Sequence, residues 1–262
     1  MARRLRVEIC GYHHVYNRGV AKKRIFLKDE DREKFLEILA DVSKEFKFNI
    51  HSFCLMDNHY HLLIENKKEN LSDGMRQLGS LYASYFNKTY KRTGHLWQDR
   101  FKSWYVMDEN YLFTLFKYIE SNPVKANMSS KIGEYKYSSS YSILKDGVPS
   151  FLQNSFILRD YDTSVLFDIF DIPLSQKDIK NIDKLHKIKY KQDNDGIVQS
   201  KKQSLKSYFM DIQSKKERNE AIFKAYKDDY NKSEIAKQVG LSGTGVAKII
   251  KKFIVGGWPL LG

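Results

Sequence analysis

Two short β-rich runs that meet at a turn constrain the fold of this chain more than any other feature. The runs are FNIHSFCLM and HYHLLIE, and Asp57-Asn58 lies between them. Turn-forming residues between two such runs predict a β-hairpin. A helix is predicted before the hairpin, from about Asp29 to Phe46, where apolar residues recur at helical spacing. A second helix is predicted after it, from about Ser72 to Tyr90.

Three more elements complete the pattern on either side of this unit. The stretch YHHVYN at 12–17 is expected to be a strand, and QDRFKSWYVM at 98–107 another. A third helix is expected from about Glu109 to about Pro123. The predicted order is therefore β-α-β-β-α-β-α. Its first six elements match the ferredoxin-like split βαβ arrangement, an antiparallel sheet with helices on one face, so the fold class is α+β.

The charge balance indicates a polyanionic partner. The 262 residues carry a formal net charge of +13. Displacement of counterions from phosphates favours nucleic acid for such a surplus, and we find no long basic amphipathic helix that would lie on a membrane. No apolar run approaches membrane-spanning length, and the basic amino terminus lacks the apolar core of a signal peptide. We therefore expect a soluble, cytoplasmic protein that contacts no membrane.

The pattern changes twice along the rest of the chain. It weakens from 147 to 204, which we interpret as a connecting region, partly helical near 164–170. From 205 to 262 helical periodicity returns, and three short helices resemble a helix-turn-helix DNA-binding module. Gly240 would supply the turn and Ser242 would cap the recognition helix, leaving Thr244 and Lys248 as the base readers. A small helical bundle that only packs is the alternative.

His59 and His61 are the strongest candidates for metal ligands. They flank Tyr60 on a predicted strand, and residues i and i+2 of a strand project to the same face. Two neighbouring imidazoles can hold a divalent ion such as Mn²⁺ or Mg²⁺, and the spacing leaves the metal's identity open. For an HxH pattern alone, one buried and one exposed histidine without a metal is the alternative. The two cysteines form no CxxC pair and exclude a thiolate zinc site.

Tyr118 has an unusual place on the third predicted helix. Leu112, Leu115, Phe116 and Ile119 form an apolar stripe at 100° per residue, and Tyr118 lies off its centre. From there its side chain could reach a site on the sheet. An aromatic residue at the edge of the core is the alternative.

Several motifs in consistent order resemble one family. MDNHYHLLIE resembles the MxNHxHLL signature of HUH endonucleases, in particular the REP-associated tyrosine transposases and their insertion-sequence relatives. YIESNPVKA resembles their YIxxNPVxA motif, and YHHVYNRG, DREKFLEIL, HLWQDRFKSWYV and YSSSY extend the resemblance from about Tyr12 to Tyr141. Asp57 stands where the family often has proline, a change that affects the turn more than the chemistry.

This resemblance implies a reaction. Residues 1–146 would be the catalytic domain, with Tyr118 as the nucleophile and Asn122 as a third metal ligand beside His59 and His61. A metal-dependent transesterification would cut and rejoin single-stranded, hairpin-associated DNA through a 5′-phosphotyrosine, without ATP. Insertion-sequence relatives are dimers that exchange tyrosine helices, whereas REP-associated members can act as monomers, so monomer and homodimer both stay open.

The remaining candidates are DNA contacts. Basic residues would bind the backbone and aromatic residues would stack on unpaired bases. They are Arg18, Lys22, Lys23, Arg24, Arg100, Lys102, Trp97, Trp104 and Tyr105. His13, His14, His95 and His186 are interpreted as structural. Two other functions stay open: a DNA-binding regulator whose nuclease has decayed, and a metal-dependent nuclease in which water attacks.

Overall fold

The computed structural model describes residues 8–186, 190–193, 196–199, 204–210, 212–228 and 230–255. The chain divides into two compact units, Met1–Ile197 and Val198–Gly262. Among the described residues, no helix is both long enough and apolar enough to cross a membrane.

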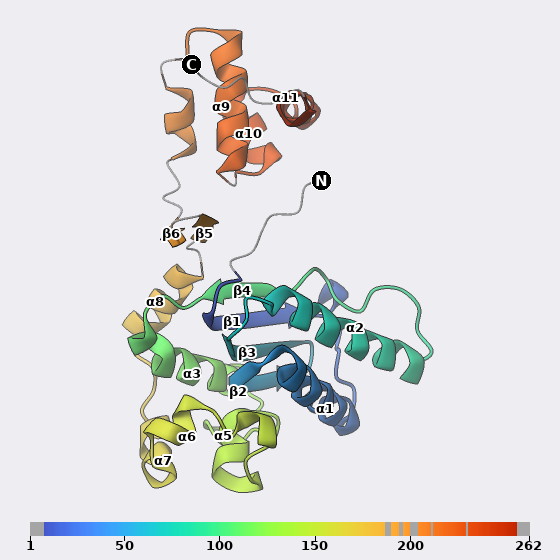
Figure 1. Ribbon diagram of the computed structural model, residues 1–262, viewed down its shortest axis with the longest axis vertical. Helices are drawn as coiled ribbons and strands as arrows, with labels where there is room; N and C mark the ends of the chain where they lie inside the picture. Colours follow the sequence, from blue (N-terminus) through green and yellow to red (C-terminus); the bar gives the residue numbers. More distant parts are fainter. Residues whose placement is uncertain are drawn as a thin grey trace. The chain divides into compact units, whose positions relative to one another are not determined.

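The first unit is built on a four-stranded antiparallel sheet (Figure 1). Its strands are β1 (Gly11–Arg18), β2 (Phe48–Met56), β3 (His59–Asn66) and β4 (Lys102–Tyr105), in the spatial order β2-β3-β1-β4. The three predicted helices are α1 (Asp29–Phe46), α2 (Leu71–Thr89) and α3 (Leu112–Glu120). The predicted α+β fold and the order β-α-β-β-α-β-α are confirmed, and the predicted bounds of α1 agree with the structure.

The two faces of the sheet carry different chemistry because side chains alternate along each strand. On one face Tyr60 is fully buried, and its ring lies 4.8 Å from that of Phe35 on α1. Tyr82 of α2 lies 5.1 Å from Phe35, so α1 and α2 cover this apolar face. The opposite face carries His59, His61 and Ser52. Ser52 donates a hydrogen bond to Glu120 at the end of α3, so α3 packs on this second face.

Asp57 holds the hairpin turn between β2 and β3 in place. Its backbone carbonyl accepts hydrogen bonds from the amides of Ile25 and Phe26. Its carboxylate pairs with Arg32 of α1 at 2.6 Å and with Arg24 at 3.1 Å. The carboxylate therefore ties the turn both to α1 and to the segment that precedes it. The histidine pair follows directly after this turn.

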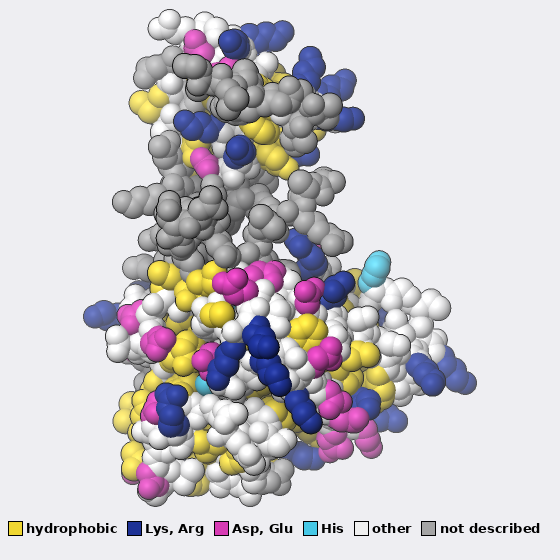
Figure 2. Space-filling model, viewed as in Figure 1, with side chains coloured by type: hydrophobic (Ala, Val, Ile, Leu, Met, Phe, Trp, Pro, Cys, Tyr) yellow, Lys and Arg dark blue, Asp and Glu magenta, His cyan; other side chains and the backbone are white. Residues whose placement is uncertain are grey.

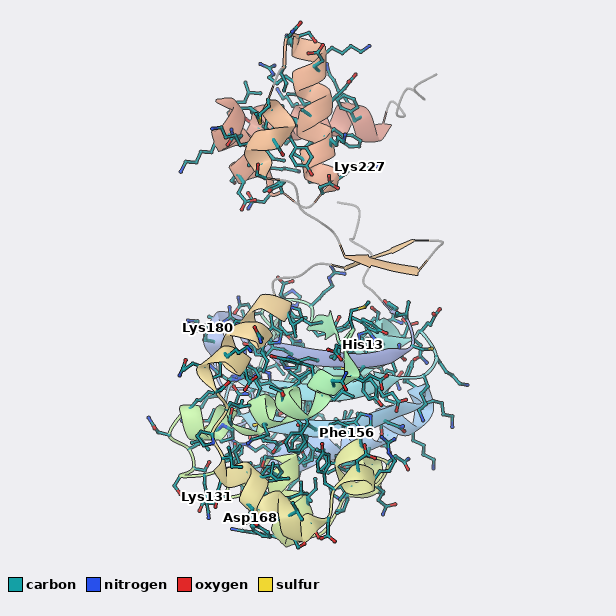
Figure 3. The ribbon with its side chains drawn as sticks, turned by 90° about the vertical axis from the view of Figure 1, so that its left-hand side faces the viewer. His13, Lys131, Phe156, Asp168, Lys180 and Lys227 are labelled. Carbon is teal, nitrogen blue, oxygen red and sulfur yellow. The ribbon has the colours of Figure 1, made fainter. Side chains whose placement is uncertain are left out.

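The segment from 147 to 186 differs from the predicted connecting region. It contains four helical segments whose apolar side chains enter the core of the first unit, with Leu152, Ile157 and Leu166 all fully buried. Phe156 lies 5.2 Å from the ring of His51 on β2, and Figure 3 shows it between the sheet and these helices. Short helices with few apolar residues each give little periodicity, which is why the sequence pattern looked weak there. Part of the predicted connection (187–189, 194–195 and 200–203) lies outside the described residues.

The second unit contains three helices around a small core. They are α9 (Lys215–Lys227), α10 (Lys232–Val239) and α11 (Gly243–Val255). Val246 and Ile250 of α11 are buried against Ile222 and Ile235. Gly240 ends α10 with φ of 69°, a left-handed conformation that favours glycine, and the Ser242 hydroxyl accepts from the Gly245 amide at the start of α11. Residues 256–262 of the predicted module lie outside the described residues.

The remaining elements are short. In the first unit they are η1 (Val20–Lys22), η2 (Glu109–Tyr111), α4 (Asn122–Lys125), α5 (Ser139–Tyr141), η3 (Ser142–Asp146), η4 (Ser150–Leu152), α6 (Phe156–Asp160), α7 (Thr163–Asp171) and α8 (Gln176–Leu185). Strands β5 (Tyr190–Asp193) and β6 (Gly196–Gln199) pair with each other, and η5 (Leu205–Phe209) precedes α9.

Glu120 anchors α3, and its removal should destabilise the fold. Its buried carboxylate accepts hydrogen bonds from the hydroxyls of Ser52 and Ser139 and from the Ser140 amide. Glu120→Ala leaves these donors unsatisfied and should lower the free energy of unfolding by about 2–4 kcal/mol. Glu37→Ala, at an exposed position of α1, is the matched control and should change it by less than about 0.5 kcal/mol in urea unfolding.

The same carboxyl gives a pH dependence with a defined sign. Burial raises the pKa of Glu120, although its hydrogen bonds oppose the shift. Stability linked to a raised pKa is present below the unfolded value and is lost as pH rises through the folded value. The unfolding free energy of the wild type should therefore fall relative to that of Glu120→Gln as pH rises above about 4.3. Parallel curves for the two proteins would contradict this.

Candidate active site

The pairing of β1 with β3 gathers the histidines on one face of the sheet. Tyr16 lies opposite His61 and Arg18 lies opposite His59. Directly opposed residues of an antiparallel pair project to the same face. His14 lies two residues before Tyr16 on β1 and therefore projects to this face as well. The rings of His59 and His61 lie 5.2 Å apart, which confirms that the predicted pair projects together.

Asn58 fixes the hydrogen position on His59. The Asn58 amide nitrogen donates to the backbone carbonyl of Lys22 at 3.0 Å, which orients the side-chain amide. Its oxygen then faces His59 Nδ1 at 2.6 Å. Because a carbonyl oxygen only accepts, Nδ1 carries the hydrogen and Nε2 carries the lone pair. Burial, with a smaller contribution from the charge of Arg18, lowers the pKa of His59 to about 4, so the ring is neutral at pH 7.

His61 begins a chain of three imidazoles. Its Nδ1 lies 2.9 Å from Nε2 of His14, and Nδ1 of His14 lies 2.9 Å from Nε2 of His186. Burial, followed by the neighbouring histidines, lowers the pKa of His14 and of His61 well below the usual value. Burial also lowers the pKa of His186 to about 4. All three rings are therefore neutral at pH 7.

Tyr118 of α3 lies beside this chain. Its half-buried ring is 6.3 Å from that of His14 and 5.8 Å from that of His186. The ammonium nitrogen of Lys125 lies 4.2 Å from the centroid of the Tyr118 ring. Burial, and secondarily the charge of Asp183, raises the pKa of the Tyr118 phenol.

The local fold explains the position of Tyr118. Leu115, Phe116 and Ile119 are buried, as the predicted apolar stripe requires, and the Glu120 carboxylate fixes the end of the helix on β2. Tyr118, one position off the stripe, is left facing the histidines. Asn122, the predicted third ligand, donates its amide hydrogens to the carbonyls of Tyr118 and Ile119, each at 3.0 Å. Its nitrogen is thus engaged at the helix end, and Oδ1 is the atom left to bind a ligand.

The predicted DNA contacts fall into distinct places. Arg18 lies on the histidine face, and exposed Lys102 of β4 shares this face opposite Tyr16. The other predicted basic contacts are exposed in two loops, one after β1 and one before β4. In the first loop Arg24 pairs with Asp57. The contacts in the two loops are Lys22, Lys23, Arg24 and Arg100. Figure 2 shows Lys and Arg side chains distributed over both units.

The tryptophans have different environments. Trp104 lies at the histidine face, where its indole nitrogen donates to the carbonyl of His186 at 2.7 Å and its ring is 4.3 Å from that of His186. Trp97 belongs to the other side of the sheet. Its nitrogen donates to the Gly79 carbonyl at 2.8 Å and its ring is 5.7 Å from that of Tyr60, so Trp97 has a packing role. Tyr105 lies on the same face as His13, 5.2 Å from its ring.

The structure adds four residues to the site. Asn58 and Lys125 were not assigned from the sequence, whereas His14 and His186 were interpreted as structural and instead lie beside His61 and Tyr118. His14 and Tyr16 are two residues apart on β1 and so share a face of the sheet. This spacing points to the site only once the pairing of β1 with β3 is known. Nothing in the sequence links His186 to a motif some 125 residues earlier, because its position depends on the packing of α8.

The donor atoms fit a divalent ion. His59 presents Nε2 with its Nδ1 hydrogen held by Asn58, an arrangement typical of histidines that bind metals. His61 has Nδ1 engaged with His14, which leaves its Nε2 as the second nitrogen. The described residues contain no group of three or more His, Cys, Asp or Glu side chains suited to a metal. An amide oxygen such as that of Asn122, phosphate and water would complete the shell.

The site thus combines a four-stranded antiparallel sheet, a histidine pair on one strand and a tyrosine on the helix that packs on the same face. Residues 6–122 match the family described as transposase IS200-like. The match covers less than half of the chain, and it supports the predicted resemblance to insertion-sequence transposases over this segment.

Solved structures similar to the chain include two transposases. One is a REP-associated tyrosine transposase bound to a REP hairpin, with 16% identity over 58% of this chain and 90% of that chain, and a TM-score of 0.46. The other is a candidate transposase from Deinococcus radiodurans R1, with 17% identity over 46% of this chain and 97% of that chain, and a TM-score of 0.33. Comparison with curated proteins found no match.

The histidines of the site should titrate far below the usual range. Imidazole NMR signals of His59 and His186 should report a pKa of about 4 for each. A lowered histidine pKa means that the unfolded chain binds the proton more readily, so these groups should make the fold less stable as pH falls from about 6.5. A midpoint near 6.5 for either ring would contradict the burial described here.

Proposed function

We propose that this protein cuts and rejoins single-stranded DNA through a covalent bond between Tyr118 and a 5′-phosphate, with a divalent metal ion held by His59 and His61. The observation that carries the proposal is the placement of Tyr118 over the histidine face of the sheet, within the segment that matches IS200-like transposases. We propose the cytoplasm as its compartment because its substrate is DNA.

The reaction is a balanced exchange of one phosphodiester bond for another. The phenol of Tyr118 loses its proton and its oxygen bonds to phosphorus. The bond from phosphorus to the 3′-oxygen breaks, and that oxygen takes a proton as the 3′-hydroxyl leaves. A different 3′-hydroxyl can reverse the step, so rejoining needs neither ATP nor an oxidant.

The residues of the site have separable roles. A bound Mn²⁺ or Mg²⁺ would polarise the scissile phosphate. His59 and His61 would hold it through Nε2, with Asn122 Oδ1 as a third candidate. Lys125 lies against the Tyr118 ring, so its charge favours the phenolate, whereas burial and Asp183 oppose ionisation. Arg18, whose charge acts on His59, would contact the phosphate.

The substrate is proposed to be a strand next to a DNA hairpin. The net charge of +13 supports a polyanionic partner, and the similar solved structure of a REP-associated transposase is bound to a REP hairpin. Because Tyr118 faces the histidines of its own chain, we propose that a monomer is competent for cleavage.

We propose that the second unit is a helix-turn-helix module that adds affinity for DNA. Thr244 and Lys248 are exposed on α11, on the side away from buried Val246 and Ile250. Lys251 and Lys252 extend this basic surface by one turn. An exposed basic face opposite an apolar one is the form that a recognition helix takes.

Loss of the Tyr118 hydroxyl should abolish covalent capture of DNA. A pool of 3′-labelled single strands that form hairpins is incubated with protein and Mn²⁺, then separated on a denaturing gel. The wild type should carry label at protein size, and Tyr118→Phe should reduce this band at least about 1,000-fold. Tyr141→Phe, outside the site, is the matched control and should retain the band.

Other outcomes of that gel would support other functions. Cleavage without a labelled protein band would indicate that water attacks the phosphate. Tight binding of a strand from the pool, without cleavage of that strand, would indicate a DNA-binding regulator. Either result would overturn the proposed mechanism.

Neutralising the basic face of α11 should weaken binding without changing the chemistry. Lys252→Ala, on the same basic surface, should lower DNA affinity and reduce the slope of log K against log salt by about 1, as expected for one lost phosphate contact. The rate of cleavage at a saturating concentration of DNA should be unchanged. Lys224→Ala, exposed on α9, is the control, and equal losses for both variants would argue against a recognition role for α11.

A further inference from the structure

We infer that His14 and His186 are positioning residues that hold the metal-binding form of His61, and that α8, beyond the transposase-matched segment, thereby completes the active site. The inference rests on the proposed function, because it assigns a ligand role to His61. It follows from the connected hydrogen bonds His61–His14–His186.

Binding of one metal ion by both His59 and His61 would set the direction of this chain. Asn58 fixes the Nε2 atom of His59 as a lone-pair donor. For His61 to bind the same ion through Nε2, its hydrogen must lie on Nδ1. His61 Nδ1 then donates to His14 Nε2. His14 must carry its own hydrogen on Nδ1, and it donates this to Nε2 of His186. The reversed chain would place a hydrogen on His61 Nε2 and block metal binding.

His14 is built to be such an acceptor. It is 1% exposed, so no water competes for its Nε2 atom. Both of its ring nitrogens have imidazole partners, one on β3 and one after α8. Between two neutral imidazoles a buried histidine satisfies both nitrogens in either tautomer, but its tautomer fixes the tautomers of both neighbours, so the three rings change direction only together.

His186 is held from two sides. The indole of Trp104 donates to its backbone carbonyl at 2.7 Å, and the two rings lie 4.3 Å apart. Ile182, one turn earlier on α8, is 1% exposed and fixes the helix on the first unit. His186 lies 64 residues beyond the end of the matched segment at residue 122, so the end of α8 supplies a part of the site that the family match does not include.

Two measurements without DNA test the inference. In the metal-free protein, long-range ¹⁵N NMR of the imidazoles should show His61 protonated on Nδ1, and His14→Phe should lose that state. Mn²⁺ binding, followed by electron paramagnetic resonance, should weaken about 10- to 100-fold in His14→Phe. His14→Gln can place an acceptor oxygen near the former Nε2 and should bind within about threefold of the wild type.

Controls separate the positioning role from folding and from the proposed function. His95→Phe, at an exposed position, should leave Mn²⁺ affinity unchanged. If His14→Phe does not fold, His186→Phe at its half-buried position carries the test and should weaken Mn²⁺ binding. Wild-type affinity in a folded His14→Phe or His186→Phe protein, or His61 protonated on Nε2, would overturn the inference. If the wild type binds no Mn²⁺, the proposed function fails, while the His61 tautomer still decides the role of His14.

Discussion

The alternation of side chains along β1 and β3 is the constraint on which the rest of this structure depends. It sends Tyr60 and its apolar neighbours to the face covered by α1 and α2, and it sends His59 and His61 to the other face. A slip of one residue in this register would bury the histidines in the core and expose Tyr60. The core and the site are therefore two results of one pairing.

Once the faces are separated, the buried apolar stripe of α3 packs on the sheet, and a polar anchor at the end of the helix brings the nucleophile into place. The Glu120 carboxylate, buried among Ser52, Ser139 and Ser140, supplies it. Tyr118 is half a turn from Glu120 and so faces the histidines rather than the core. Around Tyr118 every histidine is neutral although the chain carries a net charge of +13. Neutral rings keep lone pairs for a metal, while the surface charge acts on DNA at longer range.

The sequence predicted those parts of the fold and site that depend on local patterns. The bounds of α1, the hairpin turn at Asp57-Asn58 and the shared face of His59 and His61 follow from periodicities of 3.6 and 2. What it missed depends on contacts between distant segments. His14 joins the site through strand pairing, and His186 joins it through the packing of α8. The helices from 147 to 186 share their apolar residues with an existing core, so each is too short to show a period.

The most direct test of the account is to map where DNA becomes attached to the protein. Trypsin should release the peptide 118–125 (YIESNPVK), which contains a single tyrosine, from protein that has reacted with DNA and been treated with nuclease. The account predicts that mass spectrometry finds the nucleotide on Tyr118 in this peptide, or in the longer one formed if the bulky adduct blocks cleavage after Lys117. A nucleotide on another tyrosine, or cleaved DNA with only free 5′-phosphates, would contradict it.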